Sequence, residues 1–145
     1  MRQMIAFPVG VAAVAALLAF ASPTYAETVQ FNADLKGSSE VPPNQSAGTG
    51  TVTATYDTAT KKLTWKGSYS GLSGPATAAH FHGPAPAGQN SGVAVAIKPA
   101  TSPFEGSATL TDAQAADLMA GNWYVNVHTD ANKGGELRGQ VTKKM

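Results

Sequence analysis

The chain has 145 residues, with ten basic side chains, nine acidic side chains and no cysteine. This near-neutral balance argues against nucleic acid and acidic membrane surfaces as partners, because both attract basic proteins. The absence of cysteine excludes thiol nucleophiles, and it means that an exported domain of this size must gain its stability from packing, a metal or oligomerisation.

The N-terminus resembles a secretory signal peptide. Arg2 precedes an apolar stretch that ends at Ala21, and Thr24 and Ala26 supply the small residues that a signal peptidase reads. We therefore expect cleavage after Ala26. The remaining residues 27–145 carry nine basic and nine acidic side chains and are enough for one domain with a single core.

A membrane anchor is the alternative interpretation of this stretch. It is just long enough to span a bilayer, but Pro8 and Gly10 interrupt it and no basic stop-transfer cluster follows. We favour a signal peptide over residues 1–26, no membrane insertion after its removal, and a periplasmic or secreted location.

Alternation of apolar and polar residues predicts about eight short strands rather than helices. The expected strands cover residues 28–35, 52–56, 63–69, 76–82, 93–98, 104–110, 122–129 and 136–142. The two prolines between Glu40 and Ser46 predict a loop there. Eight strands are typical of an all-β fold, a Greek-key β-sandwich or flattened barrel.

One short crossover helix interrupts the strands. Thr111 and Gln114 have the spacing of a capping box, and Gly121 can end the helix. Leu118 and Met119 lie on its apolar face, so we place Met119 in the core rather than treat it as a soft copper ligand.

All three histidines of the chain fall in two of the predicted strands. Within residues 76–82, alternation places His80 and His82 on one face, about 6–7 Å apart, and points Phe81 to the opposite face. His128 lies in the strand 122–129. The final hairpin tests whether its face agrees, because one register should separate polar from apolar residues.

That register pairs polar residues across residues 122–142 on one face. The pairs are His128 with Glu136, Asn126 with Arg138, and Tyr124 with Gln140. Apolar residues, Trp123 and Leu137 among them, gather on the other face. All three imidazoles are therefore expected on the outer surface of the sandwich.

Three imidazoles that converge from two strands predict a metal site at His80, His82 and His128. Neutral imidazoles suit copper or zinc, and we rank copper ahead of zinc. Three such ligands leave a position open for water or an exogenous ligand. The segment Gly83–Gly92, which is rich in glycine and proline, can fold over the ion as a semi-rigid cover.

Polar neighbours can complete this site. Glu136 and Asp130 are the carboxylates best placed to supply a fourth ligand or to receive an imidazole N–H, although Glu136 can instead pair with Arg138 and Asp130 can merely shape its turn. Asn126 is expected to act as a hydrogen-bonding partner rather than as a ligand.

Three segments, Ala79–Ala85, Gly121–Thr129 and Gly134–Gln140, together resemble the CHRD domain, the repeated module of chordin that also occurs as a lone exported domain in bacteria. The resemblance implies a β-sandwich similar in plan to Cu,Zn superoxide dismutase, whose copper histidines project from the outside of a barrel. It does not settle the function. Lys133 stands where many members carry proline, which should loosen the turn without affecting a histidine.

These observations leave two leading hypotheses. The first is an exported protein that holds one copper-like ion for sequestration, delivery or an unidentified redox reaction; the second is a metal-free interaction or matrix module that binds a protein or a glycan. Superoxide dismutase activity is disfavoured because the chain has only three histidines. No phosphate-binding or serine-hydrolase motif is present. A serine–histidine–carboxylate triad whose members are far apart in the sequence stays an open alternative. We favour a protein without enzymatic activity.

Overall fold

The structure is a computed structural model that describes residues 10, 12–21 and 25–145. The predicted signal peptide therefore lies partly outside the described residues. Those of its residues that are described, 10 and 12–21 among them, carry no helix or strand. In the part of the chain that the structure describes, none of the helices has the length and apolar character needed to cross a membrane.

Eight strands form the domain, and each overlaps one of the predicted strands. They are β1 (Thr28–Lys36), β2 (Thr49–Asp57), β3 (Lys62–Ser70), β4 (Ala76–His82), β5 (Val93–Ile97), β6 (Phe104–Thr109), β7 (Trp123–Thr129) and β8 (Leu137–Lys143). A short 3-10 turn, η1 (Gly37–Ser39), leads into the loop predicted from its two prolines. The all-β prediction is confirmed.

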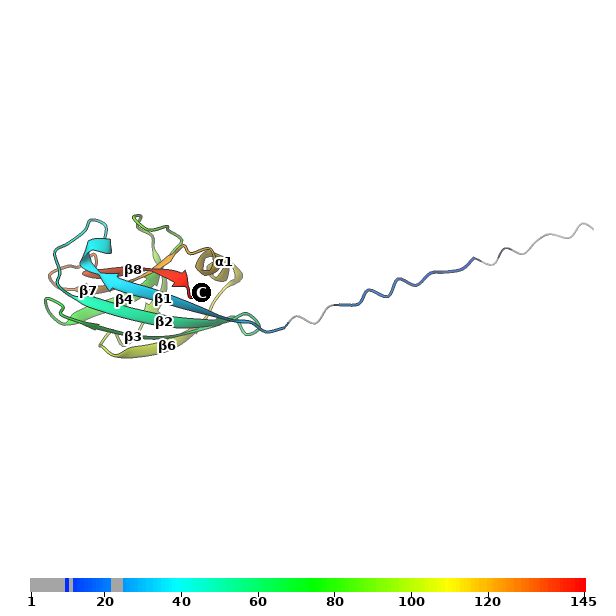
Figure 1. Cartoon of the computed structure of the whole chain (residues 1–145), viewed down its shortest axis with the longest axis horizontal. Coiled ribbons are helices and arrows are strands. Elements are labelled where there is room, and N and C mark those ends of the chain that lie inside the picture. Colours follow the sequence, from blue (N-terminus) through cyan, green and yellow to red (C-terminus); the bar gives the residue numbers. More distant parts are fainter. Residues whose placement is uncertain (1–9, 11, 22–24) are drawn as a thin grey trace, which may run out of the picture.

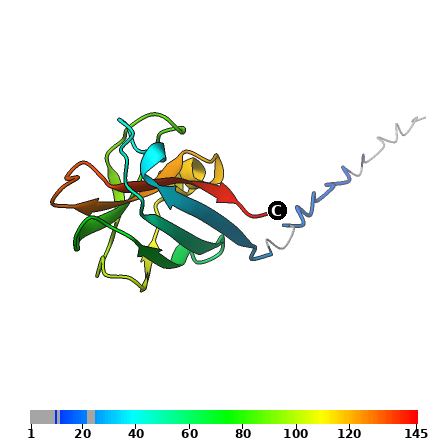
Figure 2. The same cartoon turned by 60° about the vertical axis from the view of Figure 1, so that its left-hand side comes forward.

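The strands are all antiparallel and follow the order β5-β4-β7-β8-β1-β2-β3-β6. Because β5 and β6 also lie in contact, the sheet is nearly closed into a barrel (Figures 1 and 2). Two connections, β3 to β4 and β6 to β7, pass over neighbouring strands, which is the Greek-key arrangement. The flattened barrel expected from the sequence is therefore confirmed.

The interior of the barrel holds the apolar residues of the alternating pattern. Phe81 occupies its centre, is fully buried, and packs against Trp65 at a ring-centroid distance of 5.2 Å and against Trp123 at 5.7 Å. Burial of one such side chain stabilises the fold by roughly 1.5–3 kcal/mol. Since Phe81 separates His80 from His82 in β4, its inward position fixes the outward direction of both histidines.

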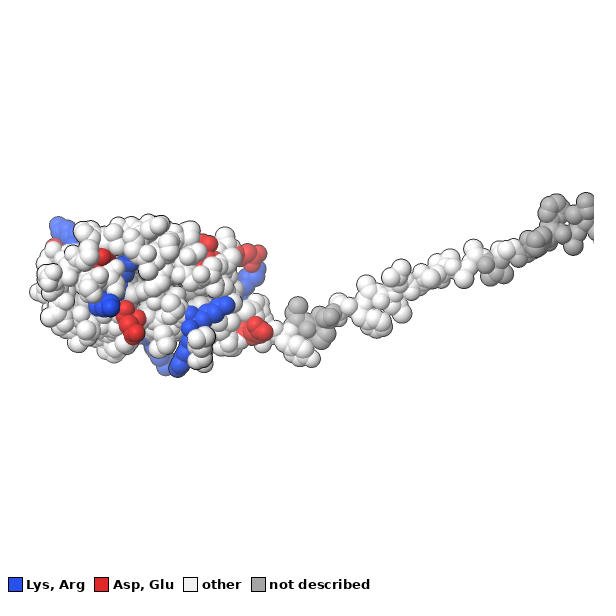
Figure 3. All heavy atoms as spheres, turned by 45° about the horizontal axis from the view of Figure 1, so that its top comes forward, with Lys and Arg blue, Asp and Glu red and all other residues white. Residues whose placement is uncertain are grey.

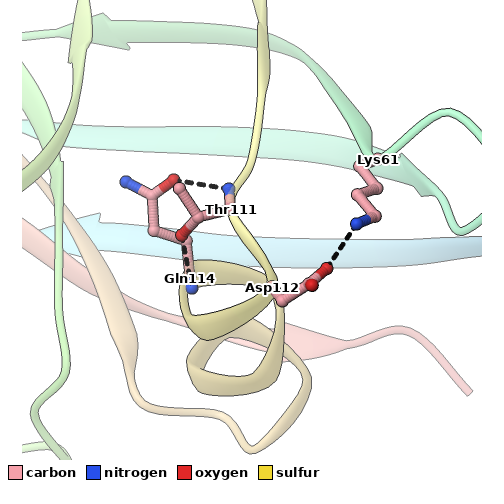
Figure 4. Close-up of polar contacts among 4 residues, drawn as sticks. All are labelled: Lys61, Thr111, Asp112 and Gln114. Atoms are coloured by element: carbon pink, nitrogen blue, oxygen red, sulfur yellow. Dashed lines mark hydrogen bonds and ion pairs between the residues drawn. The ribbon is translucent and has the colours of Figure 1, made fainter.

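The helix α1 (Asp112–Met119) begins as predicted. The Thr111 side chain accepts a hydrogen bond from the Gln114 backbone N–H, and the Gln114 side chain accepts one from the Thr111 backbone N–H (Figure 4). Lys61 pairs with Asp112 in the first turn at 2.5 Å, but both side chains are exposed, so the pair contributes little stability. Met119 packs against the core, as expected.

The hairpin of β7 and β8 has the predicted register at two of the three expected pairs. The third, His128 with Glu136, is wrong, because the ladder ends at Val127 with Leu137 and Glu136 is buried on the other side. Tyr124 pairs with Gln140 and Asn126 with Arg138, which keeps these four residues on one face of the sheet. The turn before β8 needs Gly135, whose φ of +131° is strained for any residue with a side chain.

The charged side chains on one face of the barrel are scattered. Figure 3 shows lysine, arginine, aspartate and glutamate interspersed over a mostly uncharged face, without a large area of one sign. The face shown carries no basic stripe of the kind that binds a phosphate backbone.

Candidate metal centre

The cluster comprises His80, His82 and His128, which β4 and β7 bring to the outer face of the barrel. These strands are hydrogen-bonded neighbours, and His80 lies opposite Asn126 in their register. One ligand nitrogen from each of the three rings can be chosen such that all lie within 4.8 Å of one another. The structure therefore brings together three residues that are separated by up to 48 positions in the sequence.

Two of the rings already approach metal-bridging distance. His80 Nδ1 and His128 Nε2 are 3.1 Å apart. Two imidazole nitrogens bound tetrahedrally to one zinc-like ion, each about 2.0–2.1 Å from it, are separated by about 3.3 Å. A small widening of this contact, together with a shift of the proton on His80 Nδ1 to the other nitrogen of that ring, admits an ion between the two nitrogens. The ring of His82 completes the triangle, with centroid distances of 5.4 Å to His80 and 6.3 Å to His128.

The three rings differ in exposure, which corrects one prediction. His80 and His128 are half-buried, whereas His82 is only 8% exposed. The predicted face is right, but His82 does not lie on the open surface. The segment Gly83–Gly92 turns back over it, and the His82 ring stacks on Tyr124 with 4.8 Å between centroids and 3° between planes.

The cover segment Gly83–Gly92 is held by side chains of β7 and β8. Tyr124 Oη hydrogen-bonds to both the N–H and the carbonyl of Ser91. Arg138, which is buried, donates to the Gln89 carbonyl and to the side chain of Asn90, and its guanidinium lies 3.5 Å from the centre of the Tyr124 ring. These contacts make the cover a fixed part of the site rather than a free loop.

Hydrogen bonds to carbonyl groups restrict the tautomers of two histidines. His128 Nδ1 donates to the Lys133 carbonyl at 2.8 Å, which leaves its Nε2 lone pair directed at His80. His82 Nδ1 lies 2.9 Å from the Ser91 carbonyl, and its Nε2 lies 2.8 Å from Asn126 Oδ1. Because both partners are acceptors, the neutral ring donates to only one of them, and only the tautomer that donates to Ser91 leaves the Nε2 lone pair able to bind a metal once Asn126 moves. An imidazole whose second nitrogen donates to a carbonyl is the usual state of a metal ligand.

Burial favours the neutral form of two of the rings. Desolvation lowers the pKa of His80, and the positive charges that His128, His82 and Lys98 can carry lower it further. Desolvation also lowers the pKa of His82, against the opposing effect of its hydrogen bonds to Ser91 and Asn126. A neutral imidazole keeps the lone pair that a metal needs.

The comparisons with known proteins can now be set beside this geometry. A family model described as the CHRD domain matches residues 31–141, which include the whole cluster and its cover. The chain belongs to the CHRD domain family. The comparison with curated proteins and the comparison with solved structures return no match. The likeness in plan to Cu,Zn superoxide dismutase therefore stays an expectation.

Behind the cluster of this CHRD domain, Asn126 connects His82 to a buried glutamate. Asn126 Oδ1 lies 2.8 Å from His82 Nε2, which makes Asn126 the hydrogen-bonding partner that the sequence predicted. Its amide nitrogen lies beside Glu40, which is 5% exposed. Desolvation raises the pKa of Glu40 to about 7, although the nearby charge of Arg138 opposes this shift. A metal bound at His82 Nε2 would displace the Asn126 side chain.

The structure does not bring the two candidate carboxylates to the cluster. Asp130 is exposed in the turn after β7, and neither it nor Glu136 belongs to the group of converging ligand atoms. Glu136 is fully buried and accepts hydrogen bonds from Ser73 and Thr129 instead. Thr129 follows His128 in β7 and is buried, so the carboxylate of Glu136 is directed away from the histidine face.

Several residues of the CHRD site were not predicted to take part in it. The predicted register placed Tyr124 on the same face as Asn126, two residues away, but nothing in the sequence indicated that the Tyr124 ring would stack on His82. The burial of Glu40 and Arg138 had no sequence signal, since charged residues are rarely buried. Lys133 contacts His128 through its backbone carbonyl alone. A proline also has this carbonyl, so the presence of lysine where many family members carry proline does not affect the contact.

Proposed function

We propose that this CHRD domain binds one metal ion through His80, His82 and His128. The observation that carries the proposal is the convergence of the three ligand nitrogens within 4.8 Å. Two of them, at 3.1 Å, need only a small rearrangement to share an ion. His82 is held in place by its cover, whereas the half-buried His80 and His128 can adjust to the ion.

Copper is the metal that we propose first, with zinc second. The donor set consists of neutral nitrogens alone, which both metals accept, and copper(II) binds such sites more tightly than zinc in the general order of divalent affinities. The absence of thiolates follows from the sequence, which has no cysteine. With three protein ligands, the ion keeps an open coordination position.

The role that fits this site is sequestration or delivery of copper, or an unidentified redox reaction, outside the cytoplasm. CHRD domains are extracellular-type modules, and the predicted signal peptide over residues 1–26 supports export to the periplasm or the medium. N-terminal sequencing of the protein from an expressing cell tests this part of the proposal, since export predicts a chain that begins at Glu27.

Metal stoichiometry tests the binding itself. The purified protein, stripped with chelator, is titrated with copper(II) and separately with zinc(II), and the bound metal per chain is measured after dialysis. We expect one ion per chain for the wild type and a loss of at least about tenfold in affinity for His80→Ala, because one of three ligands is lost. Asp130→Asn is the matched control, as an exposed acidic residue outside the converging group, and should bind like the wild type.

Copper(II) in a three-imidazole site also has a spectroscopic signature. Electron paramagnetic resonance of the wild-type complex should show hyperfine coupling to imidazole nitrogens, and His128→Ala should lose part of it. Equal copper binding by wild type and both histidine variants, or substoichiometric binding without nitrogen coupling, would overturn the proposal.

A second candidate function is a metal-free module that binds a protein or a glycan. A hollow of about 320 Å³ on the outer face of β1, β2 and β3 favours it, since hydroxyl and amide side chains such as Thr53, Thr55 and Asn32 line it. Under this alternative, replacement of His80 and His82 by alanine leaves both the fold and partner binding intact. Substitutions in the hollow, such as Thr55→Arg, would abolish partner binding.

A further inference from the structure

The strand register shows which residues neighbour the histidine cluster on the side of β5. In β4, Ala78 lies opposite His128 on β7, and Ala79 lies opposite Ile97 on β5. Lys98 follows Ile97 directly after the end of β5, two residues beyond Ala96, which lies opposite His80, and the charge of Lys98 acts on His80. Side chains of residues that lie opposite one another project from the same face of the sheet.

Small residues leave this side uncovered. Ala78 lies opposite His128, and Ala96 lies opposite His80. Both side chains end at Cβ, and Ala96 is exposed. The opposite side of the cluster is closed, because Tyr124 stacks on His82 there. The partly exposed His80 and the exposed Ala96 leave the side nearest Lys98 accessible to an exogenous ligand.

The charge at this opening is positive. Lys98 is exposed, and among the residues that the structure describes the only ion pair joins Lys61 to Asp112, so the Lys98 ammonium group is free. It lies close enough to His80 to disfavour the charged imidazolium form. A divalent ion held by three neutral imidazoles keeps its double positive charge, since no carboxylate joins the converging group in the described chain.

We propose that the metal-loaded site takes a small anion at its open coordination position and that Lys98 binds the same anion by charge. This inference rests on the proposed metal site. A small anion with an oxygen or nitrogen donor fits because two neighbouring positive centres, the ion and the Lys98 ammonium group, favour it. Water takes the position when no anion is present.

Azide is a suitable probe, because its coordination to copper(II) produces a charge-transfer absorption band. The copper-loaded protein is titrated with azide at about 20 mM and about 500 mM ionic strength, after the copper content of every sample has been measured. The variants are Lys98→Met, Lys98→Arg and, as a matched control, Lys66→Met. Lys66 is an exposed lysine on β3, a strand that carries no histidine of the cluster.

We expect saturable azide binding to the wild type and a dissociation constant about fivefold higher for Lys98→Met at low ionic strength. The difference should shrink at high salt, because screening weakens a charge interaction at a partly exposed site. Lys98→Arg should keep most of the affinity, and Lys66→Met should differ from the wild type by less than about twofold.

The outcomes separate the two proposals. Full copper binding together with equal azide affinity in wild type and Lys98→Met would overturn the anion site and leave the metal site standing. Full copper binding without any azide band would do the same. A protein that binds no copper would refute the proposed function, and the anion site would fall with it.

Discussion

Glu136 is a fully buried carboxylate without an ion-pair partner among the described residues, and we predict that its replacement by glutamine is strongly destabilising. One oxygen accepts hydrogen bonds from the Ser73 hydroxyl, from the Thr129 hydroxyl at 2.8 Å and from the Asn132 amide at 3.0 Å. The other accepts from the Ser46 hydroxyl at 2.9 Å and from the Ser73 backbone N–H at 2.9 Å. Every neighbour of the carboxylate is therefore a donor.

The magnitude follows from this uniform set of donors. Glutamine has one oxygen and one NH₂ group, so in either orientation the NH₂ group faces an N–H donor, from Ser73 or from Asn132. A buried donor without a partner costs about 1–3 kcal/mol, and the hydrogen bonds that remain lose the additional strength that a charged acceptor gives them. We expect Glu136→Gln to lower the free energy of unfolding by about 3 kcal/mol, a large part of the stability of a domain this size.

Urea denaturation at pH 8, followed by tryptophan fluorescence, measures this loss as a lower midpoint at an unchanged slope. Glu40→Gln is the matched control, because Glu40 is also buried but its Oε1 atom has no hydrogen-bond partner. Removal of that charge should change the stability by less than about 1 kcal/mol or increase it. Equal losses in the two variants would refute the reasoning, since burial alone and not the donor set would then determine the cost.

The pH dependence of Glu136 gives an independent check. Desolvation raises its pKa, but the hydrogen bonds from Ser73, Thr129 and Ser46 together lower it to about 2, below the ordinary value of 4.5. A lowered pKa means that the stabilisation is complete above pH 4.5 and is lost as the pH falls towards 2. Allowing for solvent screening, wild type should lose roughly 1–2 kcal/mol between pH 5 and pH 3 that Glu136→Gln does not lose.

Three further outcomes are expected. Tyr124→Phe removes the hydrogen bonds to Ser91, so hydrogen exchange at the Ser91 amide should accelerate about fivefold or more while the midpoint of global unfolding changes little. Gly135→Ala should cost at least about 2 kcal/mol, because its φ is +131° and a Cβ would collide with Glu40 and Asn126; a midpoint within 1 kcal/mol of wild type contradicts this. Burial raises the pKa of Glu40 from 4.5 to about 7, so the protonated side chain stabilises the fold fully below pH 4.5. As the pH rises through 7, the free energy of unfolding of the wild type should fall by about 2 kcal/mol. Denaturation of Glu40→Gln at several pH values should lack this decline.

The strands and the histidine face could be predicted because both depend on local alternation. Phe81 between His80 and His82 is enough to orient β4, since an apolar aromatic residue next to two polar ones has only one favourable direction at a barrel wall. The register of β7 with β8 followed in the same way, because a shift by one residue would have placed Val125 in solvent. Each of these predictions uses residues within one hairpin.

The burial of His82 could not be predicted in this way. It depends on contacts of the cover segment with Tyr124 and Arg138, which lie 33 and 49 positions from the cover residues that they bind. No local pattern specifies such contacts, and glycine and proline in Gly83–Gly92 only allow the turn. Glu136 shows the same limit: its donors come from three separate segments, so its direction depends on the completed fold.

The three histidines of the candidate site differ in how firmly their rings are held. His82 is fixed by Ser91, Asn126 and the stacked Tyr124, and it must break its contact with Asn126 before its Nε2 can bind an ion. His80 and His128 already face each other at the open side and need little rearrangement. An ion that arrives from solvent should therefore meet this pair first and gain His82 as the final ligand, and this order lets the site release the ion by the reverse path without opening the barrel.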